Sequence, residues 1–351
     1  MTAKTSDPTS ACNRQWVLAS RPVGMVSESD FEWRESPIPE PGEGEVLVRN
    51  LYLSFDPAMR GWMEDRPSYI PPVALGEPMR AGAVAQIVRS NHPDFAEGEI
   101  VQGTFGWQDY AVAAPGGPIP LTKVPAMVPL TWPLGVLGIT GLTAYFGMLD
   151  LGRPAAGETV VVSGAAGATG SVAGQVAKLQ GARVIGIAGG ASKCSWLTDE
   201  AHFDAAIDYK SEDVGARLRE LCPQGIDVFF DNVGGEILDQ VLARIAKNAR
   251  IVLCGGISGY NEKEPPPGPR NIMNLVVQRA RMEGFIVLDY LSRFVEGLTD
   301  LGTWVAEGRI SHREDIQEGL ENAPRTLLRL FRGENTGKQM LRVAEPPLER
   351  R

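Results

Sequence analysis

The chain has 351 residues and a formal net charge of −9, and 43% of its residues are hydrophobic. A chain of this length can bury a substantial core, and we expect it to form two domains. Its acidic balance argues against nucleic acid or an anionic membrane surface as the main partner.

The N-terminus and the cysteines indicate in which cellular compartment the protein lies. Residues 1–10 are polar and lack the apolar core of a signal peptide. The cysteines lie far apart in the sequence, at Cys12, Cys194, Cys222 and Cys254. We therefore expect a protein of the reducing cytoplasm.

Short candidate strands fill the first 130 residues. Turns that carry proline and glycine separate them, for example at residues 39–44. This pattern predicts a partly open β-barrel, with strands at 15–18, 31–35, 45–54, 81–88 and 100–104.

Residues 124–149 carry no charged side chain, which raises the question of a membrane span. Prolines and glycines interrupt the stretch at Pro125, Pro129, Pro133, Gly135, Gly138, Gly141 and Gly147. We therefore predict a buried connection between two domains, followed by a core helix, and no membrane partner.

The stretch from Thr159 to Lys178 organises the rest of the chain. A β-branched run ends at a turn with glycine at 164, 167 and 170, and apolar residues at helical spacing follow. Such glycines allow a tight turn, close approach of a pyrophosphate and close packing of helix on strand. The stretch predicts a dinucleotide site, with a turn built only for packing as the alternative.

The second strand of this unit, at 183–188, indicates which dinucleotide binds. Enzymes that use NAD usually carry an acidic residue at its end, where it binds the ribose hydroxyls. Here the strand ends in Ala188-Gly189-Gly190, and the first charge beyond it is Lys193. The missing carboxylate and the nearby ammonium favour a 2′-phosphate and hence NADPH, while an ordinary solvated lysine is the alternative.

Strands and helices alternate from about residue 136 to 300. Six strands with intervening helices predict a doubly wound parallel sheet, with strands near 159–163, 183–188, 205–208, 226–231, 249–254 and 282–288. A helix at 324–332 and a final strand at 338–343 are then expected to return to the first domain.

Several further blocks of sequence are spread along residues 13–343. They are NLYLSFDPAMRG at 50–61, GLTAYFG at 141–147, DNVGG at 231–235, CGGISGYN at 254–261 and GENTGK at 333–338. Together they resemble the zinc-independent branch of the medium-chain dehydrogenase/reductase superfamily. That branch contains the leukotriene B4 dehydrogenase/prostaglandin reductases, the plant alkenal double-bond reductases and the bacterial NADPH-dependent curcumin reductases.

The bacterial curcumin reductases look most similar, through residues 16–22, 90–94 and 106–110. The resemblance implies a GroES-like catalytic domain at 1–135 and 306–351 and a Rossmann domain at 136–305. It also implies a homodimer.

No metal site can be assembled from this sequence. A catalytic zinc needs three protein ligands, yet the histidines are only His92, His202 and His312, and no cysteines lie at metal-ligand spacing. Where zinc-dependent relatives carry Gly-His-Glu, this chain reads Gly76-Glu77-Pro78. An enzyme with this sequence therefore lacks the zinc ion that usually activates the hydroxyl group for alcohol oxidation.

Without a metal, such an enzyme can reduce a double bond that a carbonyl already polarises. Hydride from the nicotinamide reaches the β-carbon, and negative charge builds on the carbonyl oxygen, which needs a hydrogen-bond donor. The resemblance assigns this role to Tyr260, with a loop tyrosine packed before a proline-rich segment as the alternative. Tyr52 is a second candidate, although alternate positions in a strand often hold a core aromatic, which is the alternative for Tyr52.

The resemblance also implies cofactor contacts. The pyrophosphate is expected on Ala166, Gly167, Ala168, Thr169 and Gly170, the 2′-phosphate and adenosine at Lys193 and Tyr209, and the nicotinamide half at Asn232, Cys254, Gly255, Gly256, Ile257, Ser258, Phe285, Ile286 and Val287. Asn335 is expected to close over the cofactor. Asn232 could instead only shape a turn, and Cys254 could contribute only its backbone.

These observations predict an NADPH-dependent reductase of α,β-unsaturated ketones or aldehydes. A quinone reductase and a non-catalytic NADPH-binding protein are the alternatives. Many relatives carry tyrosine at position 58 and arginine at 62, whereas this chain has Ala58 and Trp62. The substrate pocket is thus expected to be enlarged or reshaped, which leaves the substrate open.

Overall fold

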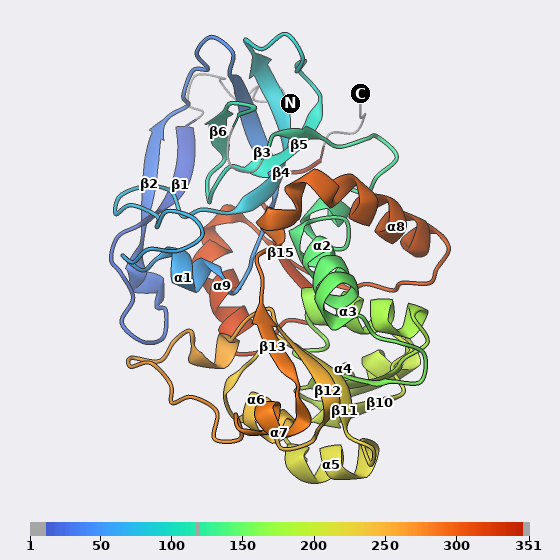
Figure 1. Cartoon of the computed structure of the whole chain (residues 1–351). Helices are drawn as coiled ribbons and strands as arrows, with labels where there is room; N and C mark the ends of the chain where they lie inside the picture. The colour runs from blue at the N-terminus through green and yellow to red at the C-terminus, as the bar shows by residue number, and fades with distance from the viewer. Residues whose placement is uncertain (1–11, 117–119, 347–351) are drawn as a thin grey trace, which may run out of the picture.

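A computed structural model describes residues 12–116 and 120–346 in two sheet-based parts (Figure 1). The polar N-terminal residues 1–10, from which the sequence predicts that no signal peptide is present, lie outside the described residues, as do both ends of the predicted GroES-like domain. The predicted boundaries at 135/136 and 305/306 stay predictions.

The nucleotide-binding part is a six-stranded parallel sheet in the order β10-β9-β8-β11-β12-β13. The order reverses between β8 and β11, which puts the crevice for a ligand at the carboxyl ends of these strands. The predicted doubly wound fold is confirmed. Its strands are β8 Thr159–Ser163, β9 Arg183–Ala188, β10 Ala205–Asp208, β11 Ile226–Asp231, β12 Ile245–Leu253 and β13 Arg281–Gly284.

Helices cover both faces of this sheet because its strands are apolar on both sides. Val160 and Val162 of β8 belong to the core shared with α2, α3, α4 and α8, whereas Val161 belongs to the core shared with α5 and α6. The helices are α2 Ile139–Phe146, α3 Ala168–Leu179, α4 Ala191–Asp199, α5 Val214–Leu221, α6 Gly235–Leu242, α7 Asn274–Gln278 and α8 Phe294–Ala306. No helix of the described residues is long and apolar enough to cross a membrane.

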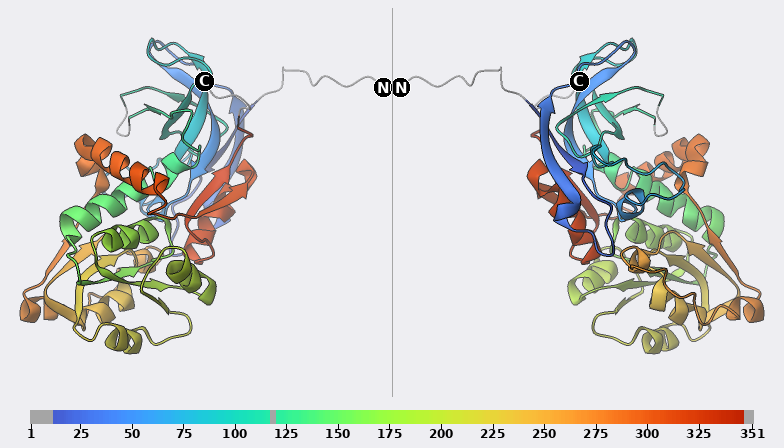
Figure 2. Two further views of the ribbon diagram at one scale, coloured as in Figure 1. Left: turned by 90° about the vertical axis from the view of Figure 1, so that its right-hand side faces the viewer. Right: turned by 90° about the vertical axis from the view of Figure 1, so that its left-hand side faces the viewer.

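The second sheet joins the two ends of the chain. Its order is β14-β15-β3-β4-β5-β7, and β6 pairs with the first half of β3. Figure 2 shows the C-terminal elements, in red, beside the blue N-terminal strands. Its strands are β3 Val46–Ser54, β4 Gly82–Ser90, β5 Ile100–Thr104, β6 Tyr110–Ala113, β7 Thr122–Lys123, β14 Glu314–Glu318 and β15 Lys338–Arg342, and the helices α1 Met59–Trp62 and α9 Ala323–Phe331 pack nearby.

Short helical turns connect these elements. They are η2 Glu28–Asp30, η3 Trp132–Leu134, η4 Gly147–Gly152, η5 Ile257–Gly259, η6 Val287–Arg293 and η7 Leu320–Asn322. The predicted strand at 282–288 ends earlier, at Gly284, because the chain then leaves the sheet edge and turns into η6. The predicted strand at 249–254 begins earlier, at Ile245.

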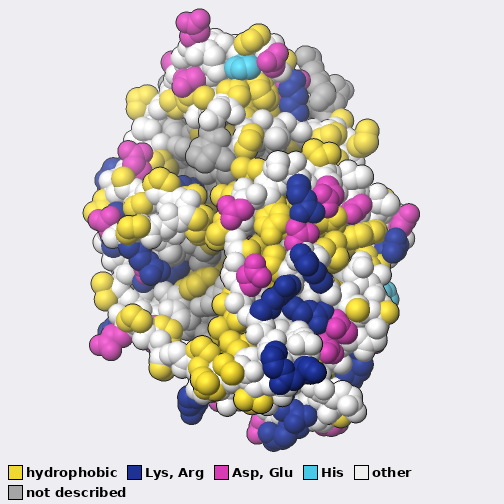
Figure 3. Space-filling model, in the orientation of Figure 1, with side chains coloured by type: hydrophobic (Ala, Val, Ile, Leu, Met, Phe, Trp, Pro, Cys, Tyr) yellow, Lys and Arg dark blue, Asp and Glu magenta, His cyan; other side chains and the backbone are white. Residues whose placement is uncertain are grey.

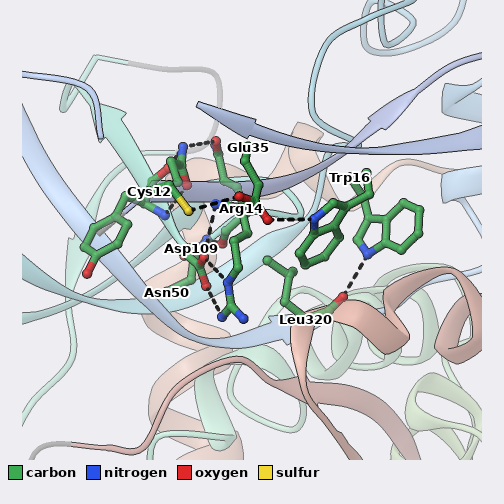
Figure 4. Close-up of polar contacts among 11 residues, drawn as sticks. Cys12, Arg14, Trp16, Glu35, Asn50, Asp109 and Leu320 are labelled. Atoms are coloured by element: carbon green, nitrogen blue, oxygen red, sulfur yellow. Dashed lines mark hydrogen bonds and ion pairs between the residues drawn. The ribbon is translucent and has the colours of Figure 1, made fainter. Parts of the chain in front are cut away.

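A separate hairpin, β1 Cys12–Leu18 with β2 Phe31–Pro37, is fixed to this sheet by polar contacts (Figure 4). The Arg14 guanidinium donates to both carboxylate oxygens of Asp109, at 2.7 and 2.9 Å. The Trp16 indole N–H donates to the Leu320 carbonyl at 2.9 Å. Because Asp109 is buried, the charged pair is shielded from water on the carboxylate side.

Replacement of this carboxylate should loosen the hairpin. Asp109→Ala removes a two-point, charge-assisted contact, so we expect the free energy of unfolding to fall by about 2 kcal/mol and the midpoint by roughly 4–8 °C. Thermal unfolding followed by circular dichroism measures this. Glu32→Ala, which breaks the exposed Arg34–Glu32 pair, is the control and should change the midpoint little. Equal shifts for both variants would contradict the prediction.

Candidate functional site

The glycine turn between β8 and α3 forms an anion cradle. Gly164 has φ +57°, and a Cβ placed at Gly170 would lie 2.4 Å from the Gly164 carbonyl oxygen. Glycine at 170 therefore lets α3 start directly against the turn, as the sequence predicts. The helix begins at Ala168, so the amides of Ala168, Thr169 and Gly170 stand in its first turn, where no helical acceptor precedes them.

The C-terminal segment at residues 335–337 crosses the glycine turn. The Gly337 amide donates to the Ala166 carbonyl at 2.8 Å, and Gly167 and Gly337 form a bridge between the two chain segments. The Asn335 side chain donates to the Gly337 carbonyl at 3.0 Å. Asn335 thus lies on the segment that passes beside the cradle, where the sequence predicts it.

Lys193 and Tyr209 come together at the end of β9. The Lys193 ammonium donates to the Gly333 carbonyl at 2.8 Å. A Cβ at Gly189 would lie 2.8 Å from the Tyr209 ring, which shows how closely the ring covers the loop after β9. Burial first, and then the charge of Lys210, lower the pKa of Lys193. Two neighbouring ammonium groups with a phenol ring suit a phosphate on an adenosine ribose.

Lys210 is a contributor that the sequence analysis did not name. Its Cε would lie 2.9 Å from a Cβ at Gly189, beside the Tyr209 ring. The available signal was a basic residue directly after the third strand, next to Tyr209. The carboxylate of Asp208 accepts the amides of Gly190 and Lys210, at 2.7 and 3.0 Å. It is therefore engaged with these loops and is not a free ribose ligand.

Asp231 ties three strand ends together, through its buried carboxylate and its backbone carbonyl. One of its oxygens accepts the Ser163 hydroxyl at 2.7 Å and the amides of Val233 and Gly234, both at 3.0 Å. Its carbonyl accepts the amides of Cys254 and Gly255. The loops that follow β8, β11 and β12 are thereby held at one edge of the sheet.

Asn232 lies between the cradle and the loop after β12. Its side-chain amide donates to the Ser163 carbonyl at 2.7 Å, and its backbone carbonyl accepts the Ile257 amide at 3.2 Å. The turn-shaping alternative is therefore an observed role of Asn232, and a cofactor contact through its side-chain oxygen is compatible with it. Ser258 is fixed similarly, since its hydroxyl donates to the Val233 carbonyl at 2.6 Å.

Tyr260 folds back over the same loop. Its hydroxyl accepts the Gly256 amide at 3.1 Å, so its own proton is left for another acceptor. Burial, with further contributions from Cys254 and Tyr69, raises the pKa of Tyr260. The phenol therefore stays protonated at neutral pH and can act as a donor.

An open hollow of about 640 Å³ lies beside this loop and β13. Cys254, Gly255, Gly256, Phe285 and Ile286 line it, whereas Val287 is buried in the core behind it. Burial raises the pKa of the Cys254 thiol to about 12, which leaves it protonated and unreactive. This agrees with a contribution from the Cys254 backbone alone.

The structure does not place Tyr52 among the residues that line this hollow. Tyr52 pairs in register with Arg342 of β15. Burial raises the pKa of Tyr52, and the charges that act on this pKa most belong to Arg342, which lowers it, and to Glu318, which raises it. This environment supports the alternative in which Tyr52 fills a strand face.

The described residues contain no group of three or more His, Cys, Asp or Glu side chains that could hold a metal ion. His312 instead stands edge-on to Trp132, with ring centroids 5.3 Å apart.

Two family models match the chain: "N-terminal domain of oxidoreductase" over residues 14–121 and "Zinc-binding dehydrogenase" over residues 168–303. The chain is 46% identical to the NADPH-dependent curcumin reductase of Escherichia coli, over 95% of this chain and 97% of that protein. The chain belongs to the zinc-independent branch of the medium-chain dehydrogenase/reductase superfamily.

Two further comparisons extend this result. The NADP(+)-dependent 2-alkenal reductase of Nicotiana tabacum is 40% identical, over 95% of this chain and 98% of that protein. The crystal structure of CurA from Vibrio vulnificus in complex with NADPH matches with a TM-score of 0.90 and 44% identity, over 95% of this chain and all of that one. As a member of this family, the chain uses NADPH as its cofactor. The cradle amides and the ammonium pair at the edge of the Rossmann sheet are the groups that we expect to hold it.

The ammonium pair should set the choice of cofactor. We expect kcat/KM for NADPH to exceed that for NADH by at least about tenfold, since one charge-assisted contact contributes roughly 1.4 kcal/mol or more. Lys193→Glu should shrink or reverse this ratio. Lys247→Glu, at an exposed position on β12, is the matched charge reversal and should leave the ratio unchanged. Equal use of both cofactors by the unmodified protein would refute the assignment.

Proposed function

We propose that this protein uses NADPH to reduce the carbon–carbon double bond of α,β-unsaturated ketones and aldehydes. The observation that carries the proposal is the Tyr260 hydroxyl, which accepts the amide of Gly256, a residue that lines the hollow, and keeps its own proton to donate. Relatives of similar length that are named as NADPH-dependent curcumin reductase and 2-alkenal reductase support the same chemistry.

The residues of the chain have distinct tasks in this reaction. NADPH supplies the hydride when it is bound. Tyr260 donates a hydrogen bond to the substrate carbonyl oxygen, where negative charge builds as the β-carbon takes up hydride. The α-carbon then takes a proton, from the Tyr260 hydroxyl or from water, which completes the saturated product. The raised pKa of Tyr260 suits this role, because the phenol is protonated at neutral pH and its O–H is present to donate the hydrogen bond.

The cofactor contacts follow the same proposal. The cradle from Ala166 to Gly170 holds the pyrophosphate, and Lys193 and Tyr209 hold the 2′-phosphate end, with Lys210 as a third member. The nicotinamide half lies against the strand-end loops. Those contacts come from Asn232, Cys254, Gly255, Gly256, Ile257, Ser258, Phe285, Ile286 and Val287, and Asn335 covers the cofactor from the C-terminal segment.

We propose that two copies of the chain associate through the edge strand β13. The outer edge of β13 has no neighbouring strand within the described part of the chain, and α7 and the two residues before it expose apolar side chains. These are Ile272, Met273, Val276 and Val277, and Figure 3 shows exposed hydrophobic side chains on the face that carries β13 and α7 in Figure 1. Light scattering tests the homodimer, and cell fractionation tests the cytoplasmic location that the sequence predicts.

One assay tests the function directly. NADPH consumption is followed at 340 nm with enones, alkenals and quinones at equal concentration, and the product is identified by mass spectrometry. Saturated ketones or aldehydes with the carbonyl intact support the proposal. Turnover of quinones without turnover of enones selects the quinone reductase. Tight NADPH binding without any turnover selects the non-catalytic alternative.

The role of Tyr260 has its own test. Tyr260→Phe keeps the ring and removes the donor, so we expect kcat on an enone to fall by about 10²-fold, or nearer tenfold if a cofactor hydroxyl shares the task. The KM for NADPH should change little. Steady-state kinetics with both substrates varied measures the two effects separately.

Tyr52→Phe is the matched control, because it removes a phenol hydroxyl from a strand of the other sheet. Its turnover should stay close to that of the unmodified protein. If Tyr260→Phe keeps kcat within about twofold and raises the KM for NADPH, Tyr260 only positions the cofactor.

A further inference from the structure

The side chain of Lys338, on β15, is almost completely buried, with 3% of the residue exposed. Its ammonium group donates to the Phe55 carbonyl at 3.0 Å and forms an ion pair with the Asp56 carboxylate. The other Asp56 oxygen accepts the Ser54 hydroxyl at 2.6 Å. A buried charge is costly unless it is paired and its donors find acceptors, so these contacts bind the ammonium group to one place.

The residues that Lys338 holds form the turn that begins α1. The Phe55 amide donates to the Gln339 carbonyl at 3.1 Å, so both backbone polar groups of Phe55 are bound to β15. The Asp56 carbonyl accepts the Met59 amide at 3.0 Å, where the helix starts. α1 has four residues, and no side chain in the described part of the chain caps its start. Because so short a helix has little stability of its own, its order depends on contacts such as these.

The backbone at Lys338 continues the segment that crosses the glycine turn. The amide of the preceding residue, Gly337, donates to the Ala166 carbonyl at 2.8 Å. A Cβ at Gly337 would lie 2.1 Å from the Arg313 carbonyl oxygen, to which the Lys338 amide donates at 2.8 Å. The segment is therefore packed closely between the cradle and Arg313, and it cannot shift without moving one of them.

The Lys338 side chain also borders α3 and the connection that contains Gly135. A small cavity of about 10 Å³ has Lys338 on one side and Ala168 and Ser171, in the first turn of α3, on another. A Cβ at Gly135 would lie 3.7 Å from Cβ and Cγ of Lys338, which places the stem of the lysine against this connection. The side chain thus runs from the cradle, past the connection between the two sheets, to Asp56.

We propose that Lys338 is a positioning residue that transmits NADPH binding at the cradle to the turn that begins α1. When the amides of the cradle bind the pyrophosphate, the glycine turn is fixed, and with it the contact between Ala166 and Gly337. The backbone at Lys338 is then fixed as well, and the ammonium group holds Phe55 and Asp56. This inference goes beyond the proposed function, because it concerns NADPH binding and not the substrate.

The two partners of the ion pair differ in their access to water. The Lys338 side chain is 3% exposed, whereas the Asp56 side chain is 26% exposed. A lysine displaced from Asp56 cannot reach water in its place, but the carboxylate can bind water instead. Asp56 is therefore the partner that can move, and the turn has an alternative arrangement when the backbone at Lys338 is not held.

Hydrogen exchange measured by mass spectrometry tests the proposal on the full chain. Exchange at residues 55–63 is compared with and without NADPH, at a concentration at least about tenfold above the dissociation constant of each protein. We expect NADPH to slow this exchange by about tenfold in the unmodified protein, within the usual range of coupling between two sites. In Lys338→Met the effect should fall below about twofold, while NADPH still protects residues 164–171.

A double variant guards against misfolding, since Lys338→Met alone leaves the Asp56 charge without its partner. Lys338→Met with Asp56→Asn removes both charges and keeps an oxygen that can accept the Ser54 hydroxyl. It should lose the NADPH effect at residues 55–63 as the single variant does. Arg342→Met is the matched control, because it breaks an exposed ion pair with Glu318 on the same strand, and it should keep the full effect.

Two results would overturn the proposal. The first is exchange at residues 55–63 that NADPH leaves unchanged in the unmodified protein. The second is an NADPH effect of equal size in the unmodified protein and in the double variant, which would show that Lys338 only stabilises the turn. Because the measurement contains no enone, failure of the reductase proposal would leave this test intact, and failure of this test would leave the reductase proposal intact.

Discussion

The site depends on one buried carboxylate at the crossover of the parallel sheet. Asp231 has no exposed surface, and burial raises its pKa, while the Ser163 hydroxyl and two backbone amides favour its charged form. Within the described residues its second oxygen has no hydrogen-bond partner. A buried carboxylate is costly to keep, so these donors cannot be lost separately without a large penalty. The carboxylate consequently locks the end of β8 to the loop after β11, while the backbone carbonyl of Asp231 holds the loop after β12 beside them.

The position of the reactive groups follows from these contacts of Asp231. The cradle begins directly after Ser163, and the loop that Tyr260 covers begins at Cys254, whose amide donates to the Asp231 carbonyl. The other sheet reaches the same edge through the C-terminal segment, by Gly337 at the cradle and Gly333 at Lys193. Both contacts lie where the pyrophosphate and the 2′-phosphate are proposed to bind. Cofactor binding should therefore also hold the two sheets together.

Much of the fold could be predicted because many of its helices and strands carry a signal in their own local sequence. The run from β8 through the glycine turn into α3 combines a β-branched strand, an obligatory glycine at 170 and helical periodicity, and each signal is independent of the rest of the chain. The strands β6, β7 and β14 carry no such signal, since they are short or polar and owe their pairing to neighbouring strands. Phe285-Ile286-Val287 is apolar like a strand but borders the hollow and η6 instead.

Parts of the site could not be predicted from sequence, because they depend on which strand faces which. Tyr52 lies on β3, which is buried on both faces over most of its length, so alternation of apolar residues cannot tell where its hydroxyl is directed. The antiparallel pairing of β3 with β15 decides this and sets Tyr52 opposite Arg342. The hydroxyl of Tyr52 is thus placed by a strand pairing, whereas the hydroxyl of Tyr260 is placed by a hydrogen bond within its own loop, from the Gly256 amide.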